Sequence, residues 1–154
     1  MTSDDESDAP PPPPPPPWDL VDVFCGGGLY SFGAHTAGMR VVAAVDSSAD
    51  ALQVYKSNFT SPVSCAEVGP GRTDFAFPAP RERLHIHLSP PCQQLSNAKR
   101  VPRSESGLEM LRWSVEMGTK YHSFSVETVH TGATLTFAKA QATANPARVA
   151  YGIY

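Results

Sequence analysis

Short apolar runs alternate with helix-like segments along most of this 154-residue sequence, and that order limits the possible folds more than any other feature. The run Leu20–Phe24 leads through a glycine-rich turn to a helix-like segment at Ser31–Ala37. A second apolar run, Arg40–Val45, is followed by Ser48, a preferred helix N-cap residue, and by an amphipathic segment at Ala49–Asn58. Since parallel strands need a crossover, which is usually a helix, this order predicts a parallel sheet.

Further elements with less regular patterns are expected downstream. In order they are a weak strand near Val63–Ala66, a strand at Leu84–Leu88, a helix at about Gly107–Met117, a strand at Ser123–Val126 and a weaker helix at Leu135–Ala144. Apart from that weak strand, the segment from Thr60 to Arg83 is rich in Pro, Gly and Ser and gives no clear periodicity. The expected fold class is α/β, a parallel sheet with helices on both faces.

The first 17 residues do not belong to the predicted domain. An acidic stretch, Ser3–Asp8, is followed by eight consecutive prolines, Pro10–Pro17. A polyproline run has no backbone donors and favours an extended conformation, so residues 1–17 are predicted to be a disordered, stiff tail. The remaining 137 residues, 18–154, are enough for one small domain with a hydrophobic core.

Charge and cysteine content exclude several classes of protein. The chain has 12 basic and 15 acidic residues, but four of the acids lie in the tail, so the body carries a formal charge of +1 and is not a strongly basic nucleic-acid binder. Cys25, Cys65 and Cys92 are far apart and odd in number, which argues against a disulfide framework or a zinc site. No apolar run is long enough to span a membrane and no signal peptide is evident, so a soluble, intracellular protein is expected.

Several of the predicted strands end in residues that can bind a ligand. Ligands of open α/β sheets bind at the carboxyl ends of the strands, where Gly26, Asp46, Cys92 and Glu127 are expected to lie together. A glycine turn lets the backbone approach a ligand closely, although it can also be only a tight connection. Asp46 is placed to accept hydrogen bonds from the hydroxyls of a ribose, or alternatively to cap a helix.

The segment Pro90–Gln93 holds the most specific candidate. A cysteine that follows two prolines at the end of a strand can serve as a nucleophile if neighbouring donors stabilise its thiolate. The alternative is a buried, inert cysteine, which is the commoner case for free Cys. Glu127, at the end of the adjacent strand, can give a proton or a hydrogen bond to a substrate nitrogen, or can be only a surface acid.

Together these motifs resemble those of the DNA cytosine-5 methyltransferases. The opening motifs are Asp22-Val-Phe-Cys-Gly-Gly-Gly28, Ser31-Phe-Gly33, Ala37-Gly38, Asp46 and Val54-Tyr-Lys-Ser-Asn-Phe59. Pro90-Pro-Cys-Gln-Gln-Leu-Ser96 is similar to the catalytic-cysteine motif of that family, and Val126-Glu-Thr-Val129 to its Glu-Asn-Val motif. The resemblance covers about Asp19 to Val129 and implies a Rossmann-like, S-adenosylmethionine-dependent methyltransferase fold.

The resemblance also implies roles for individual residues. The residues expected to bind S-adenosylmethionine are Phe24, Cys25, Gly26, Gly28, Asp46, Ser47, Glu67 and Pro90, with Asp46 on the ribose and Glu67 on the adenine. Cys92 is expected to attack C6 of a cytosine flipped out of its helix, while Glu127 engages N3 of the base. Gln93, Ser96, Lys99 and Arg100, on the loop after the nucleophile, are expected to contact the nucleic acid.

The sequence also departs from the family pattern. Leu29 replaces a usual glycine, and Thr128 replaces the asparagine after Glu127. The later arginine motif, Q-x-R-x-R, and a target-recognition region are not found, so we expect a truncated sheet with an exposed edge at Ser123–Val126, which a partner chain can complete. The alternatives left open are an RNA cytosine-5 methyltransferase, an inactive protein that binds S-adenosylmethionine or a partner's sheet edge, and a Rossmann-like protein without methyl transfer.

Overall fold

A computed structural model describes residues 14–15, 17–91, 105–129 and 131–144. The five strands of the main sheet are β1 (Asp19–Val23), β2 (Arg40–Asp46), β3 (Val63–Cys65), β6 (Leu84–Leu88) and β7 (Ser123–Val126). The helices are α1 (Leu29–Thr36), α2 (Ala49–Asn58), α3 (Glu105–Gly118) and α4 (Gly132–Ala144), and a separate hairpin is formed by β4 (Val68–Gly69) and β5 (Arg72–Thr73).

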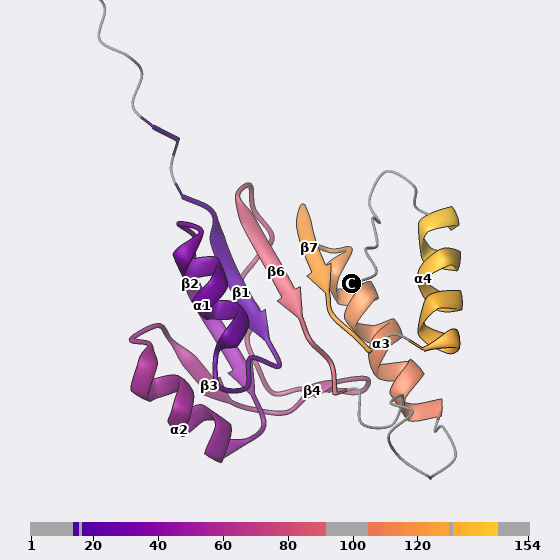
Figure 1. Cartoon of the computed structure of the whole chain (residues 1–154), viewed down its shortest axis with the longest axis horizontal. Coiled ribbons are helices and arrows are strands. Elements are labelled where there is room, and N and C mark those ends of the chain that lie inside the picture. Colours follow the sequence, from indigo (N-terminus) through magenta and orange to yellow (C-terminus); the bar gives the residue numbers. More distant parts are fainter. Residues whose placement is uncertain (1–13, 16, 92–104, 130, 145–154) are drawn as a thin grey trace, which may run out of the picture.

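The main sheet is entirely parallel and has the strand order β3-β2-β1-β6-β7 (Figure 1). Strand β1 is buried along its whole length because it is central and covered on both faces. The order reverses at β1, with β2 on one side and β6 on the other, which is the topology of a Rossmann-like, doubly wound sheet. The predicted fold class is therefore confirmed.

Helices cover both faces of the sheet, as predicted. On one face, α1 and α2 pack against β1 and β2 through a core that includes Leu20, Ala34 and Leu52. On the other face, α3 packs against β6 and β7, with Ile86 and Met117 in a second core. Since neighbouring side chains of a strand point to opposite faces, the apolar residues Leu84, Ile86 and Leu88 face α3, and the histidines between them face α1.

Most predicted boundaries agree with the structure to within two or three residues, and the differences have local causes. Helix α1 begins at Leu29 rather than at Ser31, directly after Gly28, which has a left-handed φ of 93°. The β4–β5 hairpin was not predicted, because two-residue strands are too short to show alternation. Within the described residues, β7 lies at the edge of the sheet, where the sequence predicts an exposed strand.

Candidate active site

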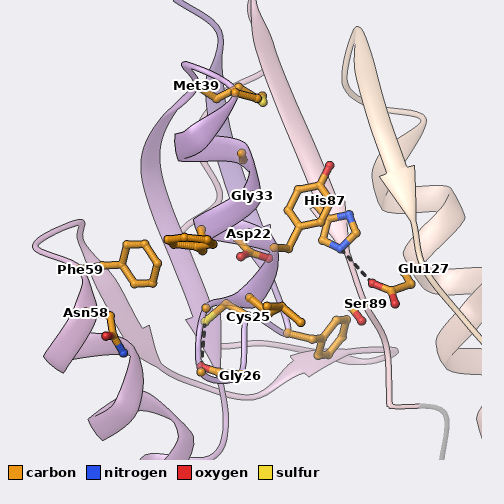
Figure 2. A pocket seen from close by; sticks show the side chains of 18 residues that line it. Asp22, Cys25, Gly26, Gly33, Met39, Asn58, Phe59, His87, Ser89 and Glu127 are labelled. Carbon is orange, nitrogen blue, oxygen red and sulfur yellow. Dashed lines mark hydrogen bonds and ion pairs between the residues drawn. The ribbon is translucent and has the colours of Figure 1, made fainter.

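A cavity of about 1120 Å³ opens at the carboxyl ends of β1 and β6 and extends along α1 (Figure 2). Its lining comes from the β1–α1 turn, from α1, from the end of α2 and from the residues that follow β6 and β7. The topological switch between β2 and β6 lies at the same place, on either side of β1. The cavity thus occupies the position where open α/β sheets bind their ligands.

The turn from β1 to α1 is held by backbone hydrogen bonds. The amides of Phe24 and Cys25 both donate to the carbonyl of Val45, over 2.9 and 3.1 Å. The amide of Gly26 donates to Oδ2 of Asp46 over 2.9 Å, and the amide of Ser48 donates to Oδ1 over 2.8 Å. Asp46 therefore joins the turn, the end of β2 and the start of α2. Each of its oxygens has a further lone pair that can accept a ligand hydroxyl.

Gly26 and Gly28 serve different purposes in this turn. A Cβ on Gly28 would lie 2.5 Å from Cε2 of Phe59 and 2.9 Å from Cδ2 of Tyr55, so α2 packs directly against this glycine. A Cβ on Gly26 would meet no atom within 4 Å, although its φ of 50° is also left-handed. Gly28 is required by helix packing, whereas the space beside Gly26 is open for a ligand.

A buried carboxylate lies below the turn. Asp22 is only 1% exposed; its Oδ2 accepts a 2.6 Å hydrogen bond from Ser31 Oγ, which also contacts the hydroxyl of Tyr55 at 3.1 Å. Its Oδ1 has no hydrogen-bond partner in the described part of the chain, although Asp22 lines the cavity. Burial, opposed by the Ser31 hydrogen bond, raises the pKa of Asp22 to about 6. Such an unpaired buried oxygen is costly unless a ligand uses it.

The opposite wall of the cavity carries His87 and Glu127, which face each other in Figure 2. His87 is 2% exposed and stacks on Tyr30, with ring centroids 3.4 Å apart and planes 2° from parallel. Its Nε2 has no hydrogen-bond partner among the described residues and lies 3.8 Å from Oε2 of Glu127, whose side chain is 71% exposed. Burial, with a smaller effect of His85, lowers the pKa of His87 to about 4, so the ring is neutral at pH 7.

Asp22 and His87 are cavity residues that the sequence motifs do not predict as site residues. Asp22 belongs to the first motif, and His87 lies in the predicted strand Leu84–Leu88. The signal that the sequence offers is that both are polar residues inside otherwise apolar strands. Their unpaired atoms, however, depend on which neighbours the sheet and α1 bring close, and a single sequence does not contain that information.

The structure brings some of the predicted site residues together and not others. Phe24, Cys25, Gly26, Gly28 and Glu127 line the cavity. Asp46 lies beside it through the Gly26 bond, Pro90 is buried after β6, and Ser47 is exposed. Glu67 is exposed and pairs with Arg72, away from the cavity lining. Cys92, Gln93, Ser96, Lys99 and Arg100 lie outside the described residues.

Cys25 is the only cavity cysteine among the described residues, and it is not suited to be a nucleophile. Burial, with smaller effects of Asp22 and Asp46, raises the pKa of its thiol to about 12. The thiolate is therefore scarce at neutral pH. Within the described segments no three metal-ligating side chains cluster, and none of the described helices is both long and apolar enough to cross a bilayer.

Residues 18–117 match the family model of the C-5 cytosine-specific DNA methylases. The chain belongs to this family. The match begins after the predicted tail and includes the glycine turn, Asp46 and the Pro90–Pro91 segment described above. It confirms the family resemblance seen in the motifs, and with it membership of a family whose methyl donor is S-adenosylmethionine.

Other comparisons add less. No curated protein matches the chain. Among solved structures the chain is similar to the plantazolicin methyltransferase BpumL in complex with a pentazolic desmethylPZN analog and SAH, at 16% identity and a TM-score of 0.46. It is also similar to BpumL in complex with SAH, at 16% identity and a TM-score of 0.42. Each match covers 82% of this chain and 43% of BpumL, so the chain spans less than half of that protein's length.

Proposed function

We propose that this chain supplies the cofactor-binding and catalytic part of a DNA cytosine-5 methyltransferase. The observation that carries the proposal is that one cavity joins the glycine turn of β1, where the family binds its cofactor, to Glu127 at the end of β7. Pro90 and Pro91 follow β6 on the same rim and lead directly to Cys92. The methyltransferase domain is taken to include residues 18–154, and residues 1–17 to be a tail outside it.

The residues on the turn side of the cavity fit S-adenosylmethionine, which supplies the methyl group when bound. The open space beside Gly26 allows close approach of a ligand to the backbone, and Asp46 keeps lone pairs for ribose hydroxyls. Oδ1 of Asp22 is a buried acceptor without a partner in the described residues, and a cationic group such as the ammonium of the cofactor would satisfy it. Glu67 remains a proposed adenine contact, which requires its pairing with Arg72 to open.

Cys92 and Glu127, the latter on the other side of the cavity, are proposed to act on the base. The Cys92 thiolate forms a bond to C6 of a cytosine flipped out of the duplex, and Glu127 holds N3 so that C6 is more electrophilic. After methyl transfer, loss of the C5 proton and breaking of the Sγ–C6 bond regenerate the cysteine. Gln93, Ser96, Lys99 and Arg100 are proposed to contact the DNA.

A covalent trapping experiment tests this proposal. DNA containing 5-fluorocytosine cannot lose a proton from C5, so incubation with S-adenosylmethionine should leave the protein joined to the DNA, as a shifted band in a denaturing gel. Cys92→Ala should give no adduct while its cofactor affinity stays within about twofold of wild type. Asp46→Ala should weaken cofactor binding in calorimetry. A folded, cofactor-binding wild-type protein that forms no adduct would contradict catalysis by this chain and favour a binding role.

The same experiment distinguishes the substrate class and the need for a partner. Adducts with 5-fluorocytosine RNA but not with DNA would indicate an RNA methyltransferase. Adducts that appear only when a second polypeptide with an arginine motif and a recognition region is added would indicate that the partner completes the sheet beyond β7. That strand forms the edge of the sheet within the described residues and is the natural place for such completion.

A further inference from the structure

Polar side chains on β6 and β7 form a row on the face of the sheet that α1 covers. The parallel register places His85 opposite Ser123 and His87 opposite Ser125. Because alternate residues of a strand share a face, the row continues to Glu127, whose amide donates to the carbonyl of Leu88 over 2.9 Å. The row therefore begins inside the sheet and ends at the cavity.

Short contacts connect the members of the row one after another. Oγ of Ser123 lies 2.8 Å from Nδ1 of His85, and Nε2 of His85 lies 2.9 Å from Oγ of Ser125. That same Oγ lies 2.8 Å from Nδ1 of His87. Nε2 of His87 is the ring nitrogen left without a hydrogen-bond partner among the described residues, and it faces Glu127 at 3.8 Å.

Three arrangements of protons satisfy these contacts with both rings neutral. In one, the Ser125 hydroxyl donates to Tyr30 and accepts from both rings, so that His87 presents a lone pair to Glu127, which is repulsive. In the other two, that hydroxyl donates to one of the histidines. Burial lowers the pKa of His85 and of His87, so each ring carries one N–H at neutral pH. If the Ser125 hydroxyl donates to His87, both histidines carry their hydrogen on Nε2, and His87 presents an N–H to Glu127. If it donates to His85 instead, both hydrogens are on Nδ1, and His87 presents a lone pair to a carboxylate. This last arrangement is also repulsive.

We propose that His87 is a positioning residue that donates its Nε2–H to one carboxylate oxygen of Glu127, and that Ser123, His85 and Ser125 adopt the proton arrangement that this tautomer requires. The exposed Glu127 side chain needs only to rotate to shorten the 3.8 Å approach to a hydrogen bond. One carboxylate oxygen is then held by His87, and the other is directed toward the base. This role rests on the proposed function, which places Glu127 at N3 of the cytosine.

Tyr30 keeps the His87 ring in the orientation that this role needs. The parallel stacking described above prevents the imidazole from turning away from Glu127. The hydroxyl of Tyr30 also lies 3.3 Å from Oγ of Ser125, where it can donate to the oxygen that has given its own hydrogen to His87. The stacking fixes the orientation of the His87 ring, and the hydroxyl contact is compatible with the proposed proton arrangement.

The tautomer can be measured without any enzymatic activity. In the full chain labelled with ¹⁵N-histidine, long-range ¹H–¹⁵N correlation spectra at pH 7 distinguish Nε2–H from Nδ1–H, and His87→Gln and His85→Gln identify the two signals among the five histidines. We expect Nε2–H for both rings. We also expect Glu127→Ala and Ser125→Ala to convert His87 to a mixture. Nδ1–H on His87, or a tautomer unchanged in both variants, would overturn the proposal.

The trapping rate supplies the functional readout. His87→Leu should slow adduct formation about tenfold, the loss expected for one charge-assisted hydrogen bond, while cofactor affinity stays within about twofold. His87→Gln, whose amide can still donate, should recover part of the rate, and His35→Gln, an exposed residue of α1, should match wild type. Equal rates for His87→Leu and wild type would refute the role. If the wild type forms no adduct, the proposed function fails, and the tautomer measurement still decides whether His87 donates to Glu127.

Discussion

Strand β1 contains two buried aspartates that differ in almost every respect. Asp19, at the amino end, is 5% exposed and receives hydrogen bonds from Arg40 at 2.7 and 3.1 Å and from Arg81 at 2.6 Å. The Arg40 hydrogen bond is the main reason that its pKa lies below the ordinary 3.8. Asp22, at the carboxyl end, has one oxygen bound to Ser31 and one unpaired within the described residues, and burial raises its pKa to about 6.

The two ends of the sheet therefore differ in whether their buried polar groups have partners within the described part of the chain. At the amino end the Asp19 carboxylate is neutralised by Arg40 and Arg81, so Asp19 stabilises the fold. At the carboxyl end, the buried polar atoms of Asp22 and His87 have no partner among the described residues and face a cavity. A protein keeps such costly groups where they interact with something that binds there, which agrees with the cofactor and base sites proposed above.

The largest effect on stability is expected from Gly28→Ala, since this cavity residue at the carboxyl end also supports the packing of the fold. A left-handed φ of 93° strains an alanine, and its Cβ would overlap Phe59 and Tyr55, so we expect a loss of about 3 kcal/mol in the free energy of unfolding, measured with urea. Gly26→Ala is the matched control: with φ 50° and no atom near the added Cβ, it should cost about 1 kcal/mol but weaken cofactor binding. Equal stability losses would contradict this division.

The next largest effect concerns the amino end. Asp19→Ala removes the partner of two arginines and should lower the free energy of unfolding by about 2 kcal/mol at pH 7, since hydrogen bonds to charged groups contribute this much. Because the folded pKa of Asp19 is lowered, its contribution is complete above the unfolded pKa of about 4 and is lost as the pH falls through the folded pKa. Urea titrations at pH 3 and 7 should show a smaller difference between variant and wild type at pH 3. A constant difference would contradict the ion-pair account.

Asp22→Asn should raise the free energy of unfolding at pH 7, whereas Asp19→Ala lowers it. With a folded pKa of about 6, Asp22 binds its proton more tightly in the folded state, so stability falls as the pH rises from about 4 to about 6. The neutral amide avoids this cost, and the variant should be more stable than wild type at pH 7 by about 1–2 kcal/mol, with no difference near pH 3. Urea titrations across this range test the sign. The variant should also bind S-adenosylmethionine more weakly. If Asp22→Asn instead lowers the free energy of unfolding at pH 7, Asp22 stabilises the fold as Asp19 does.

The sequence predicts those features of the fold and of the site that depend on residues close together in the chain. The alternating elements, the Ser48 cap and the position of Asp46 at the end of β2 follow from neighbouring residues, and the structure has them as predicted. The difference between Asp19 and Asp22 cannot be predicted from neighbouring residues. It depends on hydrogen bonds from Arg81 and Ser31, which lie farther along the chain and reach these aspartates only in the folded structure. The His85–His87 row likewise depends on the β6–β7 register. Glu67 is predicted as an adenine contact only by the family resemblance, and its pairing with Arg72 depends on the β4–β5 hairpin, which the sequence pattern does not predict.

The smallest expected effect comes from the helix that follows Asp46. The Ser48 side chain accepts a 3.2 Å hydrogen bond from the amide of Ala51, so Ser48→Ala should cost about 1 kcal/mol of unfolding free energy, the usual value for an N-cap. Ser57→Ala, an exposed serine inside α2, is the matched control and should change stability by less than about 0.5 kcal/mol. Because the amide of Ser48 also binds Asp46 and the substitution keeps that amide, cofactor affinity should remain unchanged. A large loss of affinity in Ser48→Ala would show that the hydroxyl, rather than the backbone, supports the ribose site. The cofactor side of the cavity would then depend on side chains, as the proposed base side does.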